Sequence, residues 1–274
     1  MPEYDFSGKV AFITGGARGQ GRNHAIEFAR YGADIVVADI CRSLDSVPYA
    51  LSGREDLDET VGGIESHGQH ALGVEMDVRD EGDVSSAVDR AIDEFGRLDI
   101  LVNNAGVNSS APLLQMEEPM WDEMLDTNLK GMWLAAKHVG GHMVDQGDGG
   151  KIVNTASNFA FTATPTMGHY VASKHGAMGL TKTLALELAE HDVNVNAVSP
   201  TAANTALMDG MLAAGDEDLL EAADAIAGPS NILTPEDPLI EPQDITEAVL
   251  WLSSDAARFV TGTHLDVDAG YTAK

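Results

Sequence analysis

The feature that most constrains the fold is a glycine-rich loop between a short apolar strand and a helix. Residues 9–14 read Lys-Val-Ala-Phe-Ile-Thr, and a helical pattern runs on through Phe28. Between them, residues 15–21 read Gly-Gly-Ala-Arg-Gly-Gln-Gly. Glycines at such a junction permit a tight turn and let the backbone approach a pyrophosphate at the helix N-terminus. The spacing is Gly-x-x-x-Gly-x-Gly, and in this context it predicts a nucleotide site.

The next expected strand, residues 34–39, ends on an acid that could select the nucleotide. Asp39 lies 20 residues after Gly19. A carboxylate there can accept hydrogen bonds from the adenosine ribose and would repel a 2′-phosphate, which favours NAD. Arg18 and Arg42 favour the opposite, because an arginine near the ribose can bind the phosphate of NADP. The alternative for Asp39 is a solvated strand end. At the end of the third expected strand, Asp77 could meet the adenine.

Residues 41–55 form a polar stretch with Pro and Gly and no clear periodicity. Connections in α/β units are usually 2–6 residues long, so this one is long enough to indicate either a function or disorder. We predict that it folds over the adenosine end of the nucleotide and slows its release. A disordered surface loop is the alternative.

The rest of the chain alternates expected strands with expected helices. Further strands are expected at 71–78, 99–103, 151–157, 193–200 and 263–270, and helices at 56–64, 80–95, from about 120, from 170 to 189 and from 242. This alternation predicts the α/β class. We therefore expect residues 1–274 to form a single Rossmann-type domain, a doubly wound parallel sheet of about seven strands with helices on both faces.

Three side chains could perform proton transfer at the carboxyl edge of that sheet. Tyr170 and Lys174 are four residues apart in a helical segment, so both project from one face. Ser157 lies where an expected strand ends. A phenol can exchange a proton with an alcohol oxygen when a nearby cation stabilises the phenolate. Asn128, inside an apolar helix, is either a relay or a buried structural group.

Several apolar residues are candidates for the substrate pocket. The amphipathic stretch 201–228 carries Leu207, Met208 and Met211, which suits either core or an adaptable apolar pocket. Three further apolar residues are expected to face that pocket, namely Phe159, Phe161 and Met167. None of the six is a cation that could hold a carboxylate or phosphate. We therefore expect a small apolar secondary alcohol or ketone, with a cyclic terpenoid as one candidate.

Composition excludes several other classes. The 44 acidic residues outnumber 16 basic ones, for a net charge of −28, so no basic face is available for nucleic acid. Dispersed acids predict adaptation to high salt, with an ordinary acidic enzyme as the alternative. A single Cys41 excludes a disulfide, and His138 and His142 lack a third ligand, so no metal is expected. Without a ~20-residue apolar run or a signal peptide, we expect a cytoplasmic protein with no membrane contact.

Taken in order, these motifs resemble the short-chain dehydrogenase/reductase family over essentially the whole chain. The matching features are residues 14–21, Asp77-Val78, Asn103-Asn-Ala-Gly106, Asn128, Ser157 thirteen residues before Tyr170, Tyr170-x-x-x-Lys174 and Val267-Asp-Ala-Gly270. Asp39-Ile-Cys-Arg, Val47-Pro-Tyr and residues 55–61 are similar to the mycofactocin-associated, carveol-dehydrogenase-like branch. That branch carries an insertion after the second strand, tied to a tightly held NAD. It also shares Pro200-Thr201, where most of the family has Pro-Gly.

The resemblance implies hydride transfer between an alcohol carbon and NAD. Tyr170 would exchange the hydroxyl proton, Lys174 would lower the pKa of Tyr170 and hold the nicotinamide ribose, Ser157 would orient the substrate oxygen, and Asn128 would hold a water. The implied cofactor contacts are Gly15, Arg18, Gly19, Gln20, Gly21, Asp39, Ile40, Asp77, Val78, Asn104, Ala105, Gly106, Tyr170, Lys174, Pro200, Thr201 and Thr205. The implied substrate contacts are Ser157, Phe159, Tyr170, Leu207, Met208 and Met211.

The resemblance also implies partners and alternatives. A homotetramer is expected, and an external redox carrier such as mycofactocin would be needed if NAD does not exchange. One alternative is an ordinary 3-oxoacyl or sugar-alcohol type reductase with exchangeable cofactor. The other is a catalytically silent NAD-sensing or scaffold protein, against which the complete Asn–Ser–Tyr–Lys set argues.

Overall fold

The computed structural model describes residues 4–214, 231–233 and 239–273, and for residues 211–214 it describes the backbone only. The strands are Val10–Thr14 (β1), Asp34–Asp39 (β2), Ala71–Glu75 (β3), Ile100–Asn103 (β4), Gly150–Thr155 (β5), Val193–Pro200 (β6) and His264–Val267 (β7). The α-helices are Gly19–Arg30 (α1), Arg54–Glu65 (α2), Glu81–Phe95 (α3), Glu118–Leu125 (α4), Gly131–Gln146 (α5), Gly168–Leu188 (α6), Ala206–Ala214 (α7) and Pro242–Ser253 (α9).

The strands of the described residues form one parallel seven-stranded sheet in the order β3-β2-β1-β4-β5-β6-β7. Strand β1 pairs on one side with β2 and on the other with β4, where Ala11 lies opposite Ile100. The strand order therefore reverses between β1 and β4. In open α/β sheets this reversal opens a crevice at the carboxyl ends of the strands, where ligands bind. The predicted fold class is confirmed.

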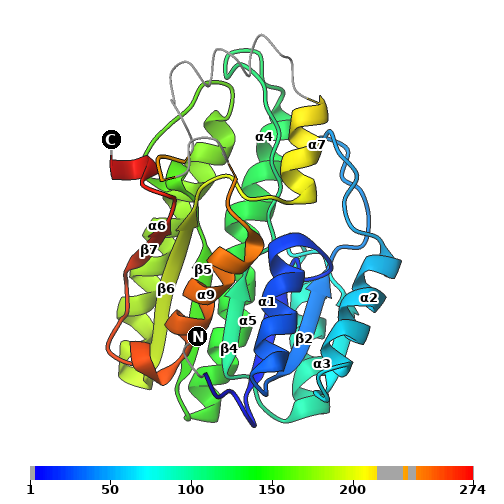
Figure 1. The fold of residues 1–274 in the computed structure, drawn as a ribbon, viewed down its shortest axis with the longest axis vertical. Helices are drawn as coiled ribbons and strands as arrows, with labels where there is room; N and C mark the ends of the chain where they lie inside the picture. The colour runs from blue at the N-terminus through cyan, green and yellow to red at the C-terminus, as the bar shows by residue number, and fades with distance from the viewer. Residues whose placement is uncertain (1–3, 215–230, 234–238, 274) are drawn as a thin grey trace.

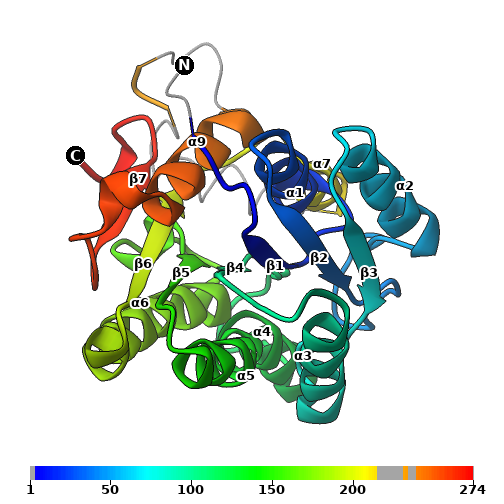
Figure 2. The same cartoon turned by 90° about the horizontal axis from the view of Figure 1, so that it is seen from below.

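Helices cover both faces of the sheet. Figure 2, which looks along the layers, shows α1, α2 and α9 on one face and α3, α4, α5 and α6 on the other. Successive residues of β1 alternate between two apolar clusters, because side chains of a strand point to opposite faces. Ile13 packs with Phe28 on the α1 side, whereas Phe12 packs with Val139 on the α5 side. Since both faces are buried, the central strands β1, β2 and β4 are nearly continuous apolar runs rather than alternating ones.

The long helix expected from about residue 120 has a more complex structure than its sequence pattern suggested. Helix α4 ends at Leu125, and a π-helical turn, Asp126–Lys130 (η1), joins it to α5. Such turns are rare and often occur at functional sites. Asn128 lies in the middle of this turn and is fully buried.

The insertion of residues 41–55 has a defined structure. Leu44 and Val47 are buried in one cluster with Val107, which lies in the loop after β4, and Met124, which lies in α4. Figure 1 shows the insertion as the blue segment between α7 and α2. Of the helices in the described ranges, none has the length and apolar character needed to cross a membrane.

Candidate active site

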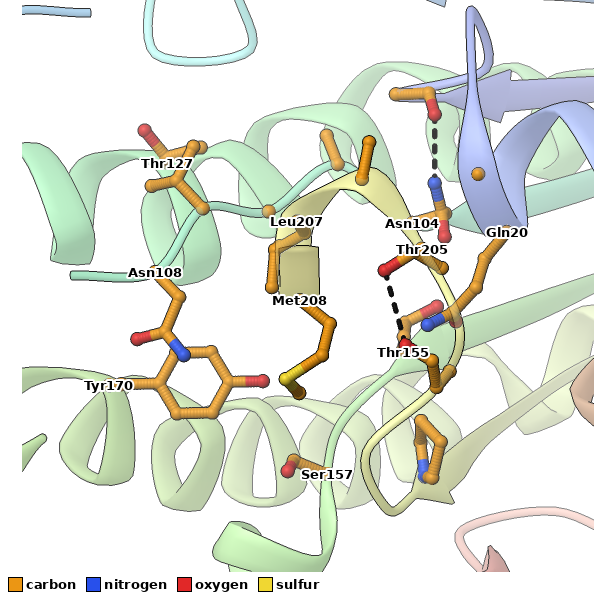
Figure 3. Close-up of a pocket in the computed structure, with 18 of the residues that line it drawn as sticks. Gln20, Asn104, Asn108, Thr127, Thr155, Ser157, Tyr170, Thr205, Leu207 and Met208 are labelled. Carbon is orange, nitrogen blue, oxygen red and sulfur yellow. Dashed lines mark hydrogen bonds between the residues drawn. The ribbon is translucent and has the colours of Figure 1, made fainter. Parts of the chain in front are cut away.

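A cavity of about 540 Å³ opens at the carboxyl edge of the sheet, around the point where the strand order reverses. Its walls come from the glycine loop, the insertion, the ends of β2 to β6, the start of α7 and the C-terminal segment. Figure 3 shows part of this lining, including Gln20, Ser157 and Leu207. It brings together most of the predicted site residues: Gly15, Arg18, Gly19, Gln20, Asp39, Ile40, Asp77, Val78, Asn104, Ala105, Gly106, Ser157, Phe159, Tyr170, Lys174, Pro200, Thr201, Thr205, Leu207 and Met208.

The glycine loop is packed too tightly for other residues. A Cβ on Gly21 would lie 2.1 Å from the carbonyl oxygen of Gly15, and Gly15 itself has a φ of +64°. Asn104 holds the loop against the end of β4 by donating from Nδ2 to the carbonyl oxygens of Thr14 (3.1 Å) and Gly15 (2.9 Å). A dashed line in Figure 3 marks a bond made by this amide. Gly21 therefore allows the close approach of α1 to the backbone of Gly15. Unlike the other predicted glycines, it does not line the cavity.

The cavity fits a dinucleotide. Gln20 Oε1, at the start of α1, is buried without a protein partner in the described structure, and so are Thr127 Oγ1 and Thr155 Oγ1. Buried polar atoms are nearly always hydrogen-bonded, so these three indicate a polar ligand that is bound in the working protein. The cavity is also continuous from Asp39 at the end of β2 to Lys174 on α6, as a dinucleotide bound across the reversal point requires.

The charged groups near the expected ribose site favour NAD over NADP. The carboxylate of Asp39 is buried and accepts hydrogen bonds from the backbone N–H of Ala17 (3.0 Å) and the hydroxyl of Ser52 (2.6 Å). Both arginines that could have held a 2′-phosphate are engaged elsewhere. Arg18 donates to the carbonyl oxygen of Ala50 (2.8 Å), and Arg42 pairs with Asp77 (2.7 Å).

Asp77 lines the cavity, but its carboxylate is already paired. Arg79 and Arg42 each donate to it at 2.7 Å. Burial alone would raise the pKa of Asp77, but the hydrogen bonds and charge of Arg79 and the charge of Arg42 outweigh it and hold the pKa below its usual value. Asp77 is therefore an anion that ties the insertion to the end of β3, and its contact with adenine stays a prediction.

Ser157, Tyr170 and Lys174 meet at the other end of the cavity. Strand β5 ends at Thr155, and Ser157 caps the short 3₁₀ turn Asn158–Ala160 (η2) that follows. The Lys174 ammonium donates to the carbonyl oxygen of Thr155 (2.8 Å) and lies 5.5 Å from the centroid of the Tyr170 ring. Helix α6 supplies both Tyr170 and Lys174, one turn apart, as predicted.

The protonation of this group follows from its burial. Burial lowers the pKa of Lys174 to about 8 and raises the pKa of Tyr170 above its usual value, although a hydrogen bond with Ser157 acts in the opposite direction. In the protein alone Tyr170 is thus a protonated phenol at neutral pH. Desolvation thus outweighs the hydrogen bond with Ser157 in the protein alone. The expected lowering of the Tyr170 pKa by Lys174 stays a prediction.

Asn128 is hydrogen-bonded to the backbone of the loop that follows β4, as a buried structural group would be. Its Oδ1 accepts from the backbone N–H of Val107 (2.8 Å), and its Nδ2 donates to the carbonyl oxygen of Val107 (2.9 Å) and contacts Met124 Sδ (3.1 Å). The side chain does not line the cavity. The water that the resemblance implies for Asn128 stays a prediction.

Comparisons with known proteins agree with this geometry. Residues 15–272 match the family model described as enoyl-(acyl carrier protein) reductase. The chain belongs to the short-chain dehydrogenase/reductase family. The (−)-trans-carveol dehydrogenase of Rhodococcus erythropolis is 40% identical over 97% of this chain and 98% of its own.

Two solved structures are similar over nearly the full length. The carveol dehydrogenase of Mycobacterium avium, crystallised in complex with NAD, is 40% identical with a TM-score of 0.91, covering 99% of this chain and 100% of its own. A short-chain dehydrogenase from Mycobacterium paratuberculosis bound to NAD is 35% identical with a TM-score of 0.91, covering 98% and 100%. The predicted resemblance to the carveol-dehydrogenase-like members is confirmed, and the sequence similarity extends across the whole chain.

The substrate side of this short-chain dehydrogenase/reductase is mostly apolar. Phe159 lies edge-on to both Tyr170 (6.4 Å between ring centroids) and Tyr271 (6.0 Å), and Met167, Leu207 and Met208 line the same region. The side chain of Met211 and residues 215–228 of the predicted flap lie outside the described part of the chain.

The expectation that Phe161 faces the pocket is wrong. Its ring packs on His264, with 4.2 Å between the centroids, and 41% of the residue is exposed. The η2 turn ends at Ala160, so the chain changes direction between Phe159 and Phe161. The alternation that would place both rings on one side holds only in an extended strand.

Sequence reasoning missed several cavity residues, among them Tyr49, Asn108 and Tyr271. Tyr49 belongs to the insertion, and its hydroxyl oxygen accepts from the backbone N–H of Asn108 (3.0 Å). Tyr271 lies in the C-terminal 3₁₀ turn, which reaches the cavity from β7. Only the motif context could have found them, because Asn108 lies just beyond Asn103-Asn-Ala-Gly106 and Tyr271 directly follows the Val267–Gly270 motif.

Proposed function

We propose that this protein transfers a hydride between NAD and an apolar secondary alcohol or its ketone. The single observation that best supports this is the meeting of Tyr170, Ser157 and Lys174 in one cavity with the glycine loop. As a member of this family with two NAD-bound relatives, the protein is an NAD-dependent oxidoreductase. A silent sensor or scaffold would not need an acid–base group beside the nucleotide site.

The residues of the chain divide the work between position and proton transfer. When bound, the nicotinamide supplies the hydride acceptor or donor. Tyr170 takes the hydroxyl proton in oxidation and returns it in reduction, and Ser157 holds the substrate oxygen beside it. Lys174, fixed by the carbonyl of Thr155, places a positive charge near the phenol oxygen when it is protonated. Ser157 and Lys174 are buried, and their low-dielectric surroundings strengthen these interactions.

The lining of the cavity supports an uncharged substrate. The charged side chains that line it in the described structure are Arg18, Asp39, Asp77 and Lys174, and the first three lie at the nucleotide end. Around Tyr170 the walls are Phe159, Met167, Leu207 and Met208. A cyclic terpenoid alcohol fits such walls, and the carveol dehydrogenases among the relatives support that class.

A screen of alcohols with NAD and an artificial electron acceptor tests this proposal. We expect turnover of cyclic and terpenoid secondary alcohols, and kcat/KM lower by about 100-fold or more for phosphorylated or acidic substrates, which would bury an unpaired charge. A clear preference for the charged substrates would refute the proposal and favour the 3-oxoacyl or sugar-alcohol reading.

The insertion supports a cofactor that is released slowly. If NAD does not exchange, an external redox carrier such as mycofactocin has to reoxidise it in place.

We also propose a homotetramer, since exposed Trp121, Trp133 and Leu186 on α4, α5 and α6 leave apolar surface for subunit contacts. The cytoplasmic location and the adaptation to high salt stay predictions.

Alcohol oxidation should become faster as the pH rises. Because burial raises the pKa of Tyr170, the phenolate fraction increases about tenfold per pH unit over the neutral range. We expect kcat/KM for oxidation to rise with a slope near one between about pH 6 and 8, and to bend above pH 8 as Lys174 loses its proton. Ketone reduction, which uses the protonated phenol, should not rise over this range. A flat or falling oxidation profile would contradict the assignment.

A further inference from the structure

The cavity contains a buried amide that the proposed chemistry does not use. Asn108 is 5% exposed and lines the cavity, yet its Oδ1 has no hydrogen-bond partner among the described residues. Buried side-chain amides are nearly always satisfied, because an unpaired group loses its hydration without compensation. An exception in a ligand cavity indicates that a bound molecule supplies the missing partner.

The backbone holds this amide at the Tyr170 end of the cavity. Both polar groups of the preceding residue, Val107, are bonded by the Asn128 amide, and the N–H of Asn108 donates to Tyr49. Val107, Tyr49 and Tyr170 belong to one apolar cluster. In Figure 3, Asn108 enters the cavity from the loop after β4 and Tyr170 enters it from α6. The two polar groups therefore reach the substrate region from different elements.

Tyr49 supplies a second unused group at the same place. Its hydroxyl oxygen already accepts from Asn108, so its O–H is left to donate, and the described protein offers it no acceptor. Burial raises the pKa of Tyr49 to about 12, which keeps the donor protonated at physiological pH. The ring is packed against α7, where a Cβ on Gly210 would lie 2.4 Å from the Tyr49 Cβ. The donor is thus fixed between the insertion and α7.

We propose that Asn108 and Tyr49 form a second oxygen site, which binds a hydroxyl or carbonyl oxygen of the substrate away from the carbon that reacts. The inference rests on the proposed function and narrows its substrate class to cyclic diols and hydroxyketones with an apolar ring. The second oxygen is neutral, because a protonated phenol and an amide provide hydrogen bonds but no cation to pair with a carboxylate. The apolar walls around Tyr170 hold the ring between the two oxygens.

Four simple alcohols test this site. Cyclohexanol and its 1,2-, 1,3- and 1,4-diols share one ring and differ only in the presence and distance of a second oxygen. With the full-length enzyme, NAD and an artificial acceptor, we expect at least one diol to exceed cyclohexanol in kcat/KM by about 10–100-fold. Asn108→Leu keeps the side-chain volume and removes the amide. It should therefore reduce the ratio of kcat/KM for the best diol to kcat/KM for cyclohexanol by a similar factor, mainly by raising KM for the diol. Tyr49→Phe should reduce it by about tenfold, and Ser110→Ala, an exposed change in the same loop, should leave it as in the wild type.

The outcomes separate this site from the proposed function. Turnover of all four alcohols with equal kcat/KM, or a ratio that survives Asn108→Leu, would overturn the second oxygen site and leave the dehydrogenase intact. Weaker NAD binding by Asn108→Leu, measured by fluorescence, with an unchanged ratio would assign the amide to the cofactor and also overturn it. If Asn108→Leu fails to fold in a melting assay, the ratio in Tyr49→Phe decides. Turnover of terpenoid alcohols but of none of these four would overturn the second oxygen site alone, whereas turnover of neither group would refute the proposed function as well.

Discussion

Replacing Tyr170 with phenylalanine should lower the turnover of every alcohol substrate by about 10²–10⁴-fold or more. The change removes the phenol hydroxyl and preserves the ring that packs on Phe159. No other group takes over the proton, because the Lys174 ammonium is bound to the carbonyl of Thr155 and a serine hydroxyl is a far weaker acid than a phenol. The measurement is kcat in steady state, together with the amount of NAD bound per subunit.

A matched control removes a phenol elsewhere. Tyr31→Phe alters a tyrosine at the end of α1, which packs on Tyr4 at the edge of the sheet remote from the cavity, and it should turn over substrate as the wild type does. Near-normal turnover in Tyr170→Phe with NAD still bound would show that the phenol is not the proton-transfer group.

Shortening the insertion should raise the rate of NAD dissociation by about 10²–10³-fold. Replacing residues 44–51 with a short Gly-Ser linker removes four hydrogen bonds to the rest of the protein. These are Arg18 to Ala50, the backbone N–H (2.9 Å) and the hydroxyl of Ser46 to Glu123, and Asn108 to Tyr49. Each is worth about 1 kcal/mol, and a tenfold rate change corresponds to about 1.4 kcal/mol. Loss of the buried side chains of Leu44 and Val47 adds to the effect. Ser52 is kept, so its bond to Asp39 remains.

The measurement has two parts. Protein purified without added nucleotide is denatured and the released NAD is quantified, and the rate of NAD exchange is then followed directly. Asp45→Asn, an exposed change within the same segment, serves as the control and should retain NAD like the wild type. Empty wild-type protein, or equal retention in the wild-type and shortened forms, would rule out a covering role for the insertion.

The elements that could be predicted from the sequence are those whose cause is local. Strand β1 lies at Val10–Thr14, within the expected residues 9–14, because an apolar run buried on both faces needs no tertiary information to be recognised. Helix α3 begins after Asp80, whose side chain accepts from the N–H of Asp83 as an N-cap should. The glycine loop followed from its position between a strand and a helix.

The parts that were missed depend on contacts between distant segments. Nothing near Asn128 in the sequence shows that its amide will bond to Val107, 21 residues earlier. Tyr49 enters the cavity only because the insertion crosses to α7, and the direction of Phe161 depends on where a three-residue turn ends. Each of these positions is determined by packing, so local propensity cannot supply it.

The pairing of β1 with β4 governs when the nucleotide site can exist during folding. The two strands lie about 90 residues apart in the chain, yet Thr14 and Asn104, at their ends, share the hydrogen bonds that shape the glycine loop. A folding chain that has paired β1 with β2, and β2 with β3, still lacks these hydrogen bonds. Non-local parallel pairings form slowly. NAD should therefore bind only after β4 has docked, stabilising the native state by mass action without guiding the earlier steps.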